Sequence, residues 1–505
     1  MTYDSVAEER KALLEELNSD VEAADAGCAC RRDDGADTPP KLPSLLQEAL
    51  LQARLSAPLG TGLMANYMLS AVSLAFVGHL GSNYLAAAAL ATTLYSAVAK
   101  IMLAGMLGAL DTYASQAVGA RNYEALGSMF NQAVLFLLLH TIPIAAGFAC
   151  LPSLLRRLGQ PEELTSLLGP YLMALLPGVW VDAFFRPFNR ILVAQHVALP
   201  QMWISSAVAV QHVGATWLFI HPLRMGYVGA AWSTVWSSFL ATALIAAYVR
   251  ASGLHRRVWH SPNGVVFQPW GPYIKLSYSA CAMRAIESWS LSICGVAAGW
   301  LPNPSAALSA MAVAFSIYGT INMIYGSMLM AACTRVGNGL GAGSAALAKR
   351  AALAAAITVP SFWSVFALVL TVPASQRAVI GLFTNESDGE LLGKMQHLLR
   401  LLAVMLLFDM SQGVMSGVAC GAGKQTKGFS INALAHWGFG LPAALLLGFH
   451  FKLGAEGMYS GLILGPFVQW MCYTRLVYRM DWDREAEVAH AKMLAIAAST
   501  AGAGI

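Results

Sequence analysis

Long apolar runs constrain this chain more than any other feature of its sequence. From about residue 54 onward, stretches of about 20 mostly uncharged residues recur, the length an α-helix needs to cross a bilayer. Inside hydrocarbon every backbone N–H and C=O group must be paired within the structure, so only helices or closed barrels can span it. The runs are continuous rather than alternating in polarity, which argues against barrel strands. We therefore expect an all-α integral membrane protein.

The apolar runs predict about twelve transmembrane helices. Their approximate cores are 55–78, 84–108, 129–151, 168–189, 200–221, 227–249, 273–299, 306–331, 350–373, 396–419, 428–450 and 456–477. Only 11% of the 505 residues are charged, whereas a soluble protein carries roughly 25%. Most of the surface is therefore expected to face lipid. The net charge of +4 is too small and too scattered to indicate nucleic-acid binding.

The spans predict two six-helix bundles with polar segments around them. The expected parts are a cytosolic N-terminal tail (1–50), a first bundle (51–250), a cytosolic inter-bundle loop (251–272), a second bundle (273–478) and a cytosolic C-terminal tail (479–505). With the N-terminus inside, the inside connections hold ten Lys or Arg residues and the outside ones six. Because cytosolic connections are enriched in Lys and Arg, we expect both termini to lie in the cytosol.

The two halves repeat one another. Gly119-Ala120 follows the second span, and Gly341-Ala342 follows the eighth, at the corresponding place of the second half. Gly226-x-x-Gly229 opens the sixth span, and Gly454-x-x-Gly457 opens the twelfth, with nearly the same separation along the chain. Each match alone is weak because glycine is common here. Their matching places indicate a duplication, with the two bundles related as internal repeats, a recurring design of secondary transporters.

Several site classes find no support in the sequence. The eight cysteines show no metal-binding or disulfide spacing, so we expect small buried side chains. There is no GxxxxGK[ST] motif, which argues against direct ATP drive. No catalytic constellation is visible, so neither an enzyme, a metal nor a cofactor is expected.

Characteristic motifs are spread over residues 50–480. The longest is Thr334-Arg335-Val336-Gly337-Asn338-Gly339-Leu340-Gly341-Ala342-Gly343. The other stretches, in chain order, are Phe76 to Gly81, Gly108 to Thr112 with Gln116, Gln195 with Pro200, Leu301 to Pro304, and Asp409 with Gln412 to Val414. Together they resemble the motifs of the multidrug and toxic compound extrusion (MATE) family, in its plant and algal, DETOXIFICATION-like branch. The most specific match is the longest stretch, which is similar to the family's RVSNELGAG.

The resemblance implies a fold and an activity. The family places two bundles of six helices around a central cavity and couples the efflux of organic compounds to inward protons or sodium, with protons usual in the plant branch. Glu287 corresponds to a family glutamate of the seventh helix and Asp409 to an aspartate of the tenth, and both acids take part in proton coupling there. Asn432 corresponds to a family asparagine. Ser292 stands where the family has a second glutamate.

Ionisable residues inside spans are costly and mark functional sites by default. Glu287, Asp409 and Asp182 are the candidate acids, and a structural ion pair stays open as the alternative for each. Arg284 precedes Glu287 by one helical turn, so a pair between them would keep Glu287 ionised. Asp182 has Arg186 at i+4. Asp409 has no basic residue one turn away, so we expect it to be the coupling residue.

Further side chains are candidates for the cavity wall. Lys100 has no counterpart in the family pattern; it could reach the interface, pair with an acid, or favour an anionic substrate. Trp289 and Tyr318 could stack on flat or cationic organic molecules, although interface packing or lipid contact is the more usual role of a single aromatic residue. Gln412 lies one turn from Asp409, in the same motif.

The sequence thus predicts a monomeric antiporter that exports xenobiotics or secondary metabolites. The expected partners are a small organic substrate, protons and the lipid bilayer, with sodium the less favoured ion and no nucleic acid. Plasma and vacuolar membranes both stay open. The first alternative is a lipid-linked oligosaccharide flippase, which would need a larger and strongly basic cavity. The second is an intramembrane acyltransferase, which would need clustered His and Asp or Asn residues in the spans.

Overall fold

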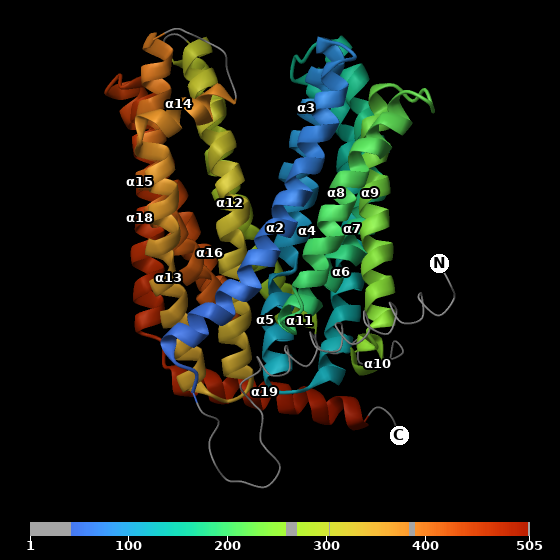
Figure 1. Ribbon diagram of the computed structural model, residues 1–505, viewed down its shortest axis with the longest axis vertical. Coiled ribbons are helices and arrows are strands. Elements are labelled where there is room, and N and C mark those ends of the chain that lie inside the picture. Colours follow the sequence, from blue (N-terminus) through green and yellow to red (C-terminus); the bar gives the residue numbers. More distant parts are fainter. Residues whose placement is uncertain (1–41, 259–269, 302–303, 383–388, 503–505) are drawn as a thin grey trace, which may run out of the picture.

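The computed structural model describes residues 42–258, 270–301, 304–382 and 389–502. Within these ranges every regular element is a helix, and no strand is present. The long helices form two bundles that meet at one end of the molecule and separate toward the other (Figure 1). This arrangement confirms the predicted all-α membrane architecture.

The N-terminal bundle has six long segments, of which the second is made of four consecutive pieces. The bounds are α2 (Leu45–Gly78), α3 (Ser82–Tyr95) with the π-helical turn η1 (Ser96–Lys100), α4 (Ile101–Met106) and α5 (Gly108–Gly119), then α6 (Tyr123–Arg157), α7 (Glu162–Ala194), α8 (Leu199–Ile220) and α9 (Tyr227–Ala251).

The C-terminal bundle also has six long segments, and its fifth, which is the eleventh of the chain, is interrupted by π-helical turns. The bounds are α11 (Trp270–Ala297) with η3 (Ala298–Trp300), α12 (Pro304–Gly341), α13 (Ala345–Thr371), α15 (Gly389–Gly421), α16 (Gln425–Asn432) with η4 (Ala433–Gly440), α17 (Leu441–Leu445) and η5 (Leu446–His450), and α18 (Gly454–Tyr478). Three peripheral helices complete the described chain: α10 (Leu254–Val258), α14 (Pro373–Gly381) and α19 (Trp482–Gly502).

Twelve long segments agree with the predicted number of spans. Within the described ranges, ten of them are long and apolar enough to cross a membrane by length and composition. The other two, α11 and α18, are 28 and 25 residues long but less apolar. Helix α11 carries Glu287 and Arg284, two of the candidate site residues.

The internal repeat is visible in the backbone of the connecting turns. Arg121 and Gly343, in the turns after the second and eighth segments, both have positive φ angles, of 56° and 72°. Arg224 and Lys452, in the turns before the sixth and twelfth segments, share φ angles of 53° and 56°. An L-residue other than glycine rarely adopts this left-handed conformation. Its recurrence at equivalent turns therefore confirms that the bundles are related as repeats.

The repeated glycines allow the two bundles to touch where α5 meets α12. A Cβ atom on Gly119 would lie 2.1 Å from the carbonyl oxygen of Asn338, and one on Gly341 would lie 1.9 Å from that of Gln116. These distances are far below van der Waals contact, so only glycine permits the approach. The Gly-Ala repeat found in the sequence therefore marks the contact between the halves.

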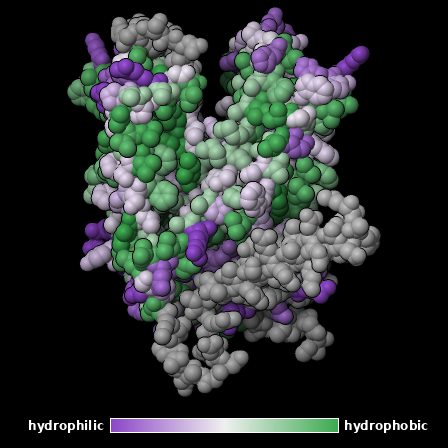
Figure 2. Space-filling view, in the orientation of Figure 1, coloured by the Kyte–Doolittle hydropathy of each residue, from purple (hydrophilic) through white to green (hydrophobic). Residues whose placement is uncertain are grey.

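A cleft separates the bundles at the end opposite α19. Figure 2 shows this hollow between two columns whose sides are mostly apolar, with hydrophilic residues gathered toward the two ends. An apolar belt of this kind is the surface expected to face lipid. The first part of α2 crosses beneath the cleft to pack against α12 and α13 of the other bundle.

The last helix, α19, lies along the closed end, beneath both bundles (Figure 1). Its Lys492 ammonium is 3.8 Å from the centre of the Tyr113 ring on α5, and the Asn122 side chain donates a 2.9 Å hydrogen bond to the carbonyl oxygen of Met493. On the other bundle, Lys424 pairs with Glu485 at 2.5 Å. The sequence predicted only a tail here, because the segment is too polar to resemble a span.

Candidate functional site

Asp409 on α15 is the most deeply buried candidate acid, with 1% of its surface exposed. The hydroxyl groups of Tyr318 and Tyr325, both on α12, donate to its Oδ2 atom, the former at 3.2 Å. The Gln412 amide donates to Oδ1 at 3.1 Å. Among the described residues no cation pairs with this carboxylate. Its negative charge is therefore stabilised by hydrogen bonds alone.

Two members of this site were not predicted from the sequence. Tyr325 contacts the carboxylate directly, and Asn322 donates to the Tyr325 hydroxyl at 2.7 Å and to the Tyr318 hydroxyl at 3.4 Å. Residues 318, 322 and 325 are spaced by four and three along α12. That spacing places polar side chains on one face of a helix, and it was the available signal.

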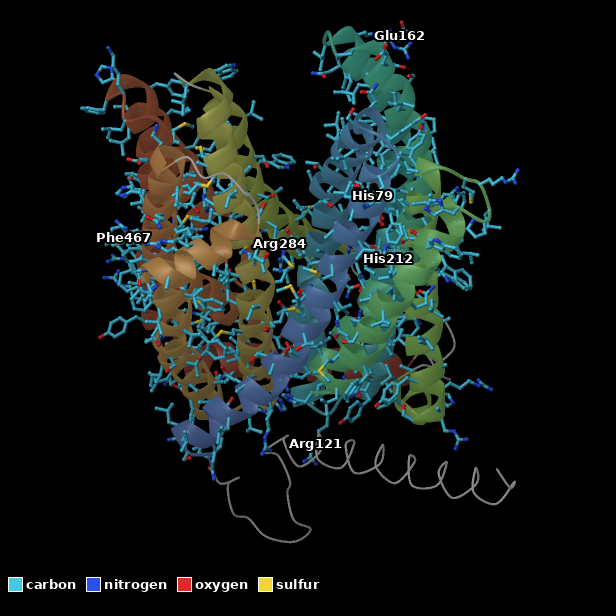
Figure 3. All side chains as sticks on the ribbon, turned by 45° about the horizontal axis from the view of Figure 1, so that its top comes forward. His79, Arg121, Glu162, His212, Arg284 and Phe467 are labelled. Carbon is cyan, nitrogen blue, oxygen red and sulfur yellow. The ribbon has the colours of Figure 1, made fainter. Side chains whose placement is uncertain are left out.

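Glu287 on α11 lies close enough to Asp409 for the two acids to interact electrostatically. In the described chain no ion pair within 4.0 Å joins Glu287 to Arg284, although the two side chains interact electrostatically. The Arg284 side chain is exposed and lies between the bundles (Figure 3). It interacts with Asp111 and Arg190 of the N-terminal bundle, which are paired at 3.2 Å. Arg284 reaches these residues of the N-terminal bundle because α11 packs against α4 and α5.

A second charged cluster lies in the N-terminal bundle. Arg186 pairs with Asp182 at 3.1 Å, as their i,i+4 spacing predicted. Lys100 ends the π-helical turn η1, with its ammonium 5.7 Å from the centre of the Tyr95 ring, and it interacts electrostatically with Asp182 and Arg186. The cluster therefore combines two cations with one acid, and the structure keeps it apart from Asp409.

Asn432 and Trp289 occupy different surroundings. Asn432 is buried; its amide donates to the carbonyl oxygen of Met283 at 3.1 Å and accepts from the Tyr473 hydroxyl at 2.8 Å. It thus joins α16 to α11 and α18. Trp289 is 47% exposed.

The closed end is held by polar contacts between the bundles. The Arg335 guanidinium donates to both carboxylate oxygens of Glu48, at 2.8 and 2.6 Å. Thr112 donates to the carbonyl oxygen of Cys420 at 2.6 Å, and the Gln116 amide to that of Gly421 at 3.0 Å. These bonds join α2 and α5 of one bundle to α12 and α15 of the other. They close the cavity at this end.

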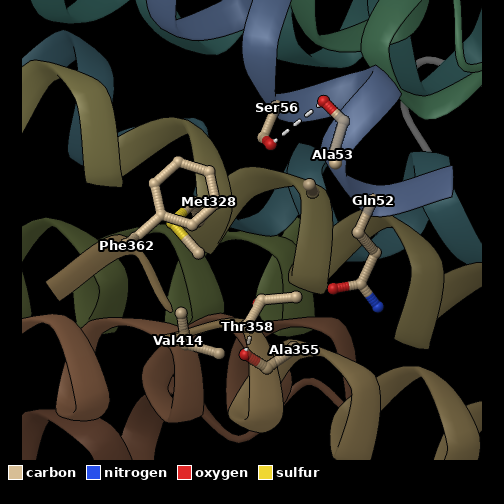
Figure 4. Close-up of a pocket in the computed structure, with 9 residues that line it drawn as sticks. Gln52, Ala53, Ser56, Met328, Ala355, Thr358, Phe362 and Val414 are labelled. Atoms are coloured by element: carbon tan, nitrogen blue, oxygen red, sulfur yellow. Dashed lines mark hydrogen bonds between the residues drawn. The ribbon is translucent and has the colours of Figure 1, made fainter. Parts of the chain in front are cut away.

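A small pocket lies where α2 crosses the C-terminal bundle (Figure 4). Its lining includes Gln52 and Ser56 from α2, Met328 from α12 and Phe362 from α13. Neither Asp409 nor Glu287 lines it. The pocket therefore belongs to the contact between the bundles and not to the acid site.

Comparisons with known proteins agree with this geometry. Protein DETOXIFICATION 17 of Arabidopsis thaliana is 32% identical over 443 residues, covering 88% of this chain and 92% of the relative. Multidrug and toxin extrusion protein 2 of Mus musculus is 31% identical over 452 residues, covering 89% and 78%. The crystal structure of the eukaryotic MATE transporter AtDTX14 superposes with a TM-score of 0.83 at 27% identity, covering 89% of this chain and all of that one. The MatE family model matches residues 58–218 and 280–446. This chain therefore belongs to the MATE family of multi-span membrane transporters.

Proposed function

We propose that this transporter exports organic compounds, such as xenobiotics or secondary metabolites, by antiport against protons. The observation that carries the proposal is the carboxylate of Asp409, which is buried, has no cationic partner among the described residues and is bonded by three neutral donors. A buried carboxylate that is not neutralised by a salt bridge can gain and lose a proton during a transport cycle.

Protonation of Asp409 would change its contacts with α12. The ionised carboxylate only accepts hydrogen bonds, and all three neighbours donate to it. A protonated carboxyl group carries one O–H of its own, so at least one of these donors must reorient. Two of the three donors, Tyr318 and Tyr325, belong to α12. Protonation of Asp409 therefore acts on α12. The same helix carries Arg335 near its C-terminal end, at the closed end of the molecule.

The second acid strengthens the case for exchange. Because Glu287 interacts electrostatically with Asp409, ionisation of one opposes ionisation of the other. A bound organic cation would favour the doubly ionised site, whereas protons would neutralise it. Proton and cation would then exclude one another, which is the requirement for antiport.

The orientation follows from the position of the chain ends. The start of α2 and the whole of α19 lie at the closed end of the molecule (Figure 1). We place this end in the cytosol because the connections there are rich in Lys and Arg. The cleft then opens to the outside of a plasma membrane or into a vacuole. A single chain carries both bundles and the whole acid site, so we propose a monomer.

Transport assays in proteoliposomes test the proposal. The panel contains an aromatic cation (ethidium), a flavonoid (quercetin) and an organic anion (citrate). We expect uptake of at least one when the vesicle interior is acidified, collapse of that uptake with a protonophore, and indifference to a sodium gradient. Uptake driven by sodium at equal pH and unaffected by the protonophore would overturn proton coupling. The flippase alternative instead predicts movement of a lipid-linked oligosaccharide without an ion gradient, and the relatives do not favour it.

A further inference from the structure

Each bundle buries one histidine on its fifth segment. His212 lies on α8 and is fully buried, and His436 lies on the π-helical turn η4 and is 3% exposed. Their separation along the chain falls between the separations of the two repeated glycine motifs, so they occupy corresponding places in the repeat. Neither residue is among the site candidates predicted from the sequence. Their surroundings differ in a way that points to different roles.

The hydrogen-bonding capacity of His212 is fully used. Its Nδ1 atom is 2.8 Å from the Ser237 hydroxyl of α9. Its Nε2 atom is 3.0 Å from the Ser73 hydroxyl and 3.1 Å from the carbonyl oxygen of Leu69, both on α2, and 3.3 Å from the Thr216 hydroxyl. This ring therefore ties α2, α8 and α9 together, and no ring nitrogen is left for another partner.

His436 retains a nitrogen without a partner. Its Nδ1 atom is 3.2 Å from the Ser290 hydroxyl of α11. That hydroxyl donates its single proton to the carbonyl oxygen of Glu287 at 2.8 Å, so it accepts from the histidine. The proton of the neutral ring therefore sits on Nδ1, and Nε2 is an acceptor. This Nε2 atom is buried and has no hydrogen-bond partner in the described structure.

A second side chain without partners stands beside it. Gln469 on α18 is fully buried, and neither its amide nitrogen nor its amide oxygen has a hydrogen-bond partner among the described residues. It lies close enough to interact with both the Glu287 carboxyl and the His436 ring. Buried polar groups are nearly always paired. Two neighbouring exceptions indicate contacts that form in another state of the site.

The backbone at His436 supports a functional role. The turn from Ala433 to Gly440 is π-helical, a conformation that is rare and frequently found at functional sites. The ionisable groups that interact with the ring or with its neighbour Gln469 are Asp409 on α15 and Glu287 on α11. Of these, only Glu287 shares Gln469 with the histidine.

We propose that His436 is a further proton acceptor of the acid site and that the Gln469 amide links its protonation to that of Glu287. In one state the amide N–H donates to Nε2 of neutral His436, and the amide oxygen accepts from protonated Glu287. In the other state the proton lost by Glu287 resides on Nε2, the imidazolium donates to the amide oxygen, and the amide N–H donates to the Glu287 carboxylate. The proton count is the same in both. Conversion breaks the O–H bond of Glu287, forms an N–H bond on Nε2 of His436 and turns the amide by half a turn. This inference rests on the proposed proton coupling.

The test compares H436Q and Q469M with H212Q, the matched change in the other bundle. Each full-length variant is reconstituted in proteoliposomes, and initial rates of proton-driven ethidium uptake are measured across pH per molecule of folded protein. We expect the midpoint of the pH profile to shift by about one unit in H436Q and in Q469M. In H212Q the folded fraction should keep the wild-type midpoint, although the yield falls. A wild-type midpoint in both H436Q and Q469M would overturn the inference.

A second measurement is independent of substrate and of variant folding. Nitrogen-15 NMR of histidine-labelled wild-type protein in lipid bilayers follows each ring nitrogen from about pH 5 to 8, the range in which histidine usually titrates. We expect the Nε2 signal of His436 to titrate and the signals of His212 to stay fixed. A His436 ring that stays neutral throughout contradicts the inference. Wild-type uptake that ignores a protonophore would instead refute the proposed function, so the two failures are distinguishable.

Discussion

The Arg335 guanidinium of α12 binds both carboxylate oxygens of Glu48 on α2, at 2.8 and 2.6 Å, with both side chains buried. These residues are 287 positions apart and belong to different bundles. The pair therefore closes the end of the molecule that carries α19. An alternating-access cycle that opens this end must separate the two charges or move them together.

Replacing Glu48 tests how much this ion pair contributes to the stability of the protein. E48Q removes the negative charge that the buried Arg335 guanidinium binds, and breaking a buried ion pair typically costs about 3–5 kcal/mol. We expect the midpoint of thermal unfolding in detergent to fall by several degrees. R54Q removes an exposed arginine from the same helix and should leave the midpoint unchanged. Equal midpoints for E48Q and the wild type would show that the pair contributes nothing to stability.

Asp409 is expected to be indispensable for coupling but not for folding. D409N mimics the protonated acid and keeps its shape, so expression should stay near normal while proton-driven export is lost. Y325F removes one donor and should lower the rate by about tenfold, the effect of roughly 1.4 kcal/mol. Transport is measured per molecule of folded protein.

D182N is the matched change in the N-terminal bundle. It removes the partner of Arg186, so we expect lower protein abundance with coupling retained in the folded fraction. Export by D409N at the wild-type rate under a proton gradient would refute its assignment as the coupling residue.

The close contact of α5 with α12 predicts that alanine substitutions at two glycines differ sharply in their effect on stability. G341A places a Cβ atom 1.9 Å from the carbonyl oxygen of Gln116, so the bundles must move apart. We expect this substitution to lower the midpoint of thermal unfolding and to weaken the contact between the bundles at the closed end. Gly147, inside α6, has open space around its Cβ position, so G147A should stabilise slightly, by about 0.4–1 kcal/mol. Similar midpoints for both variants would contradict the close approach.

The docking of α19 is expected to depend on pH through Lys492. Burial lowers the pKa of this ammonium from 10.5 to about 8, so the docked helix binds fewer protons than the undocked one between these values. Docking should therefore strengthen as the pH rises from about 8 to about 10.5. Energy transfer between dyes on α19 and α6 measures docking. K492M should abolish the pH dependence, and a wild-type signal that weakens over this window would show the sign to be wrong.

Much of the fold could be predicted from the sequence because its signals are local. Bilayer thickness sets the length of an apolar helix, so twelve spans could be counted along the chain. Helical geometry places i and i+4 side chains together, so the pair of Asp182 and Arg186 was foreseen correctly. The isolation of Asp409 from basic neighbours on its own helix was also readable, and no cation from the other described helices approaches it.

Contacts between helices were decided only by the tertiary structure. Arg284 and Glu287 share a helix face by spacing, yet no ion pair within 4.0 Å joins them in the described chain. Arg284 also interacts with the N-terminal bundle because α11 packs against α4 and α5. The donors from α12, the unpartnered nitrogen of His436 beside Gln469 and the course of α19 depend on how distant segments of the described chain meet. Sequence spacing determines which side chains share a face of one helix. The partner that each face meets is set by the packing of the whole bundle, and a single sequence carries no local signal for it.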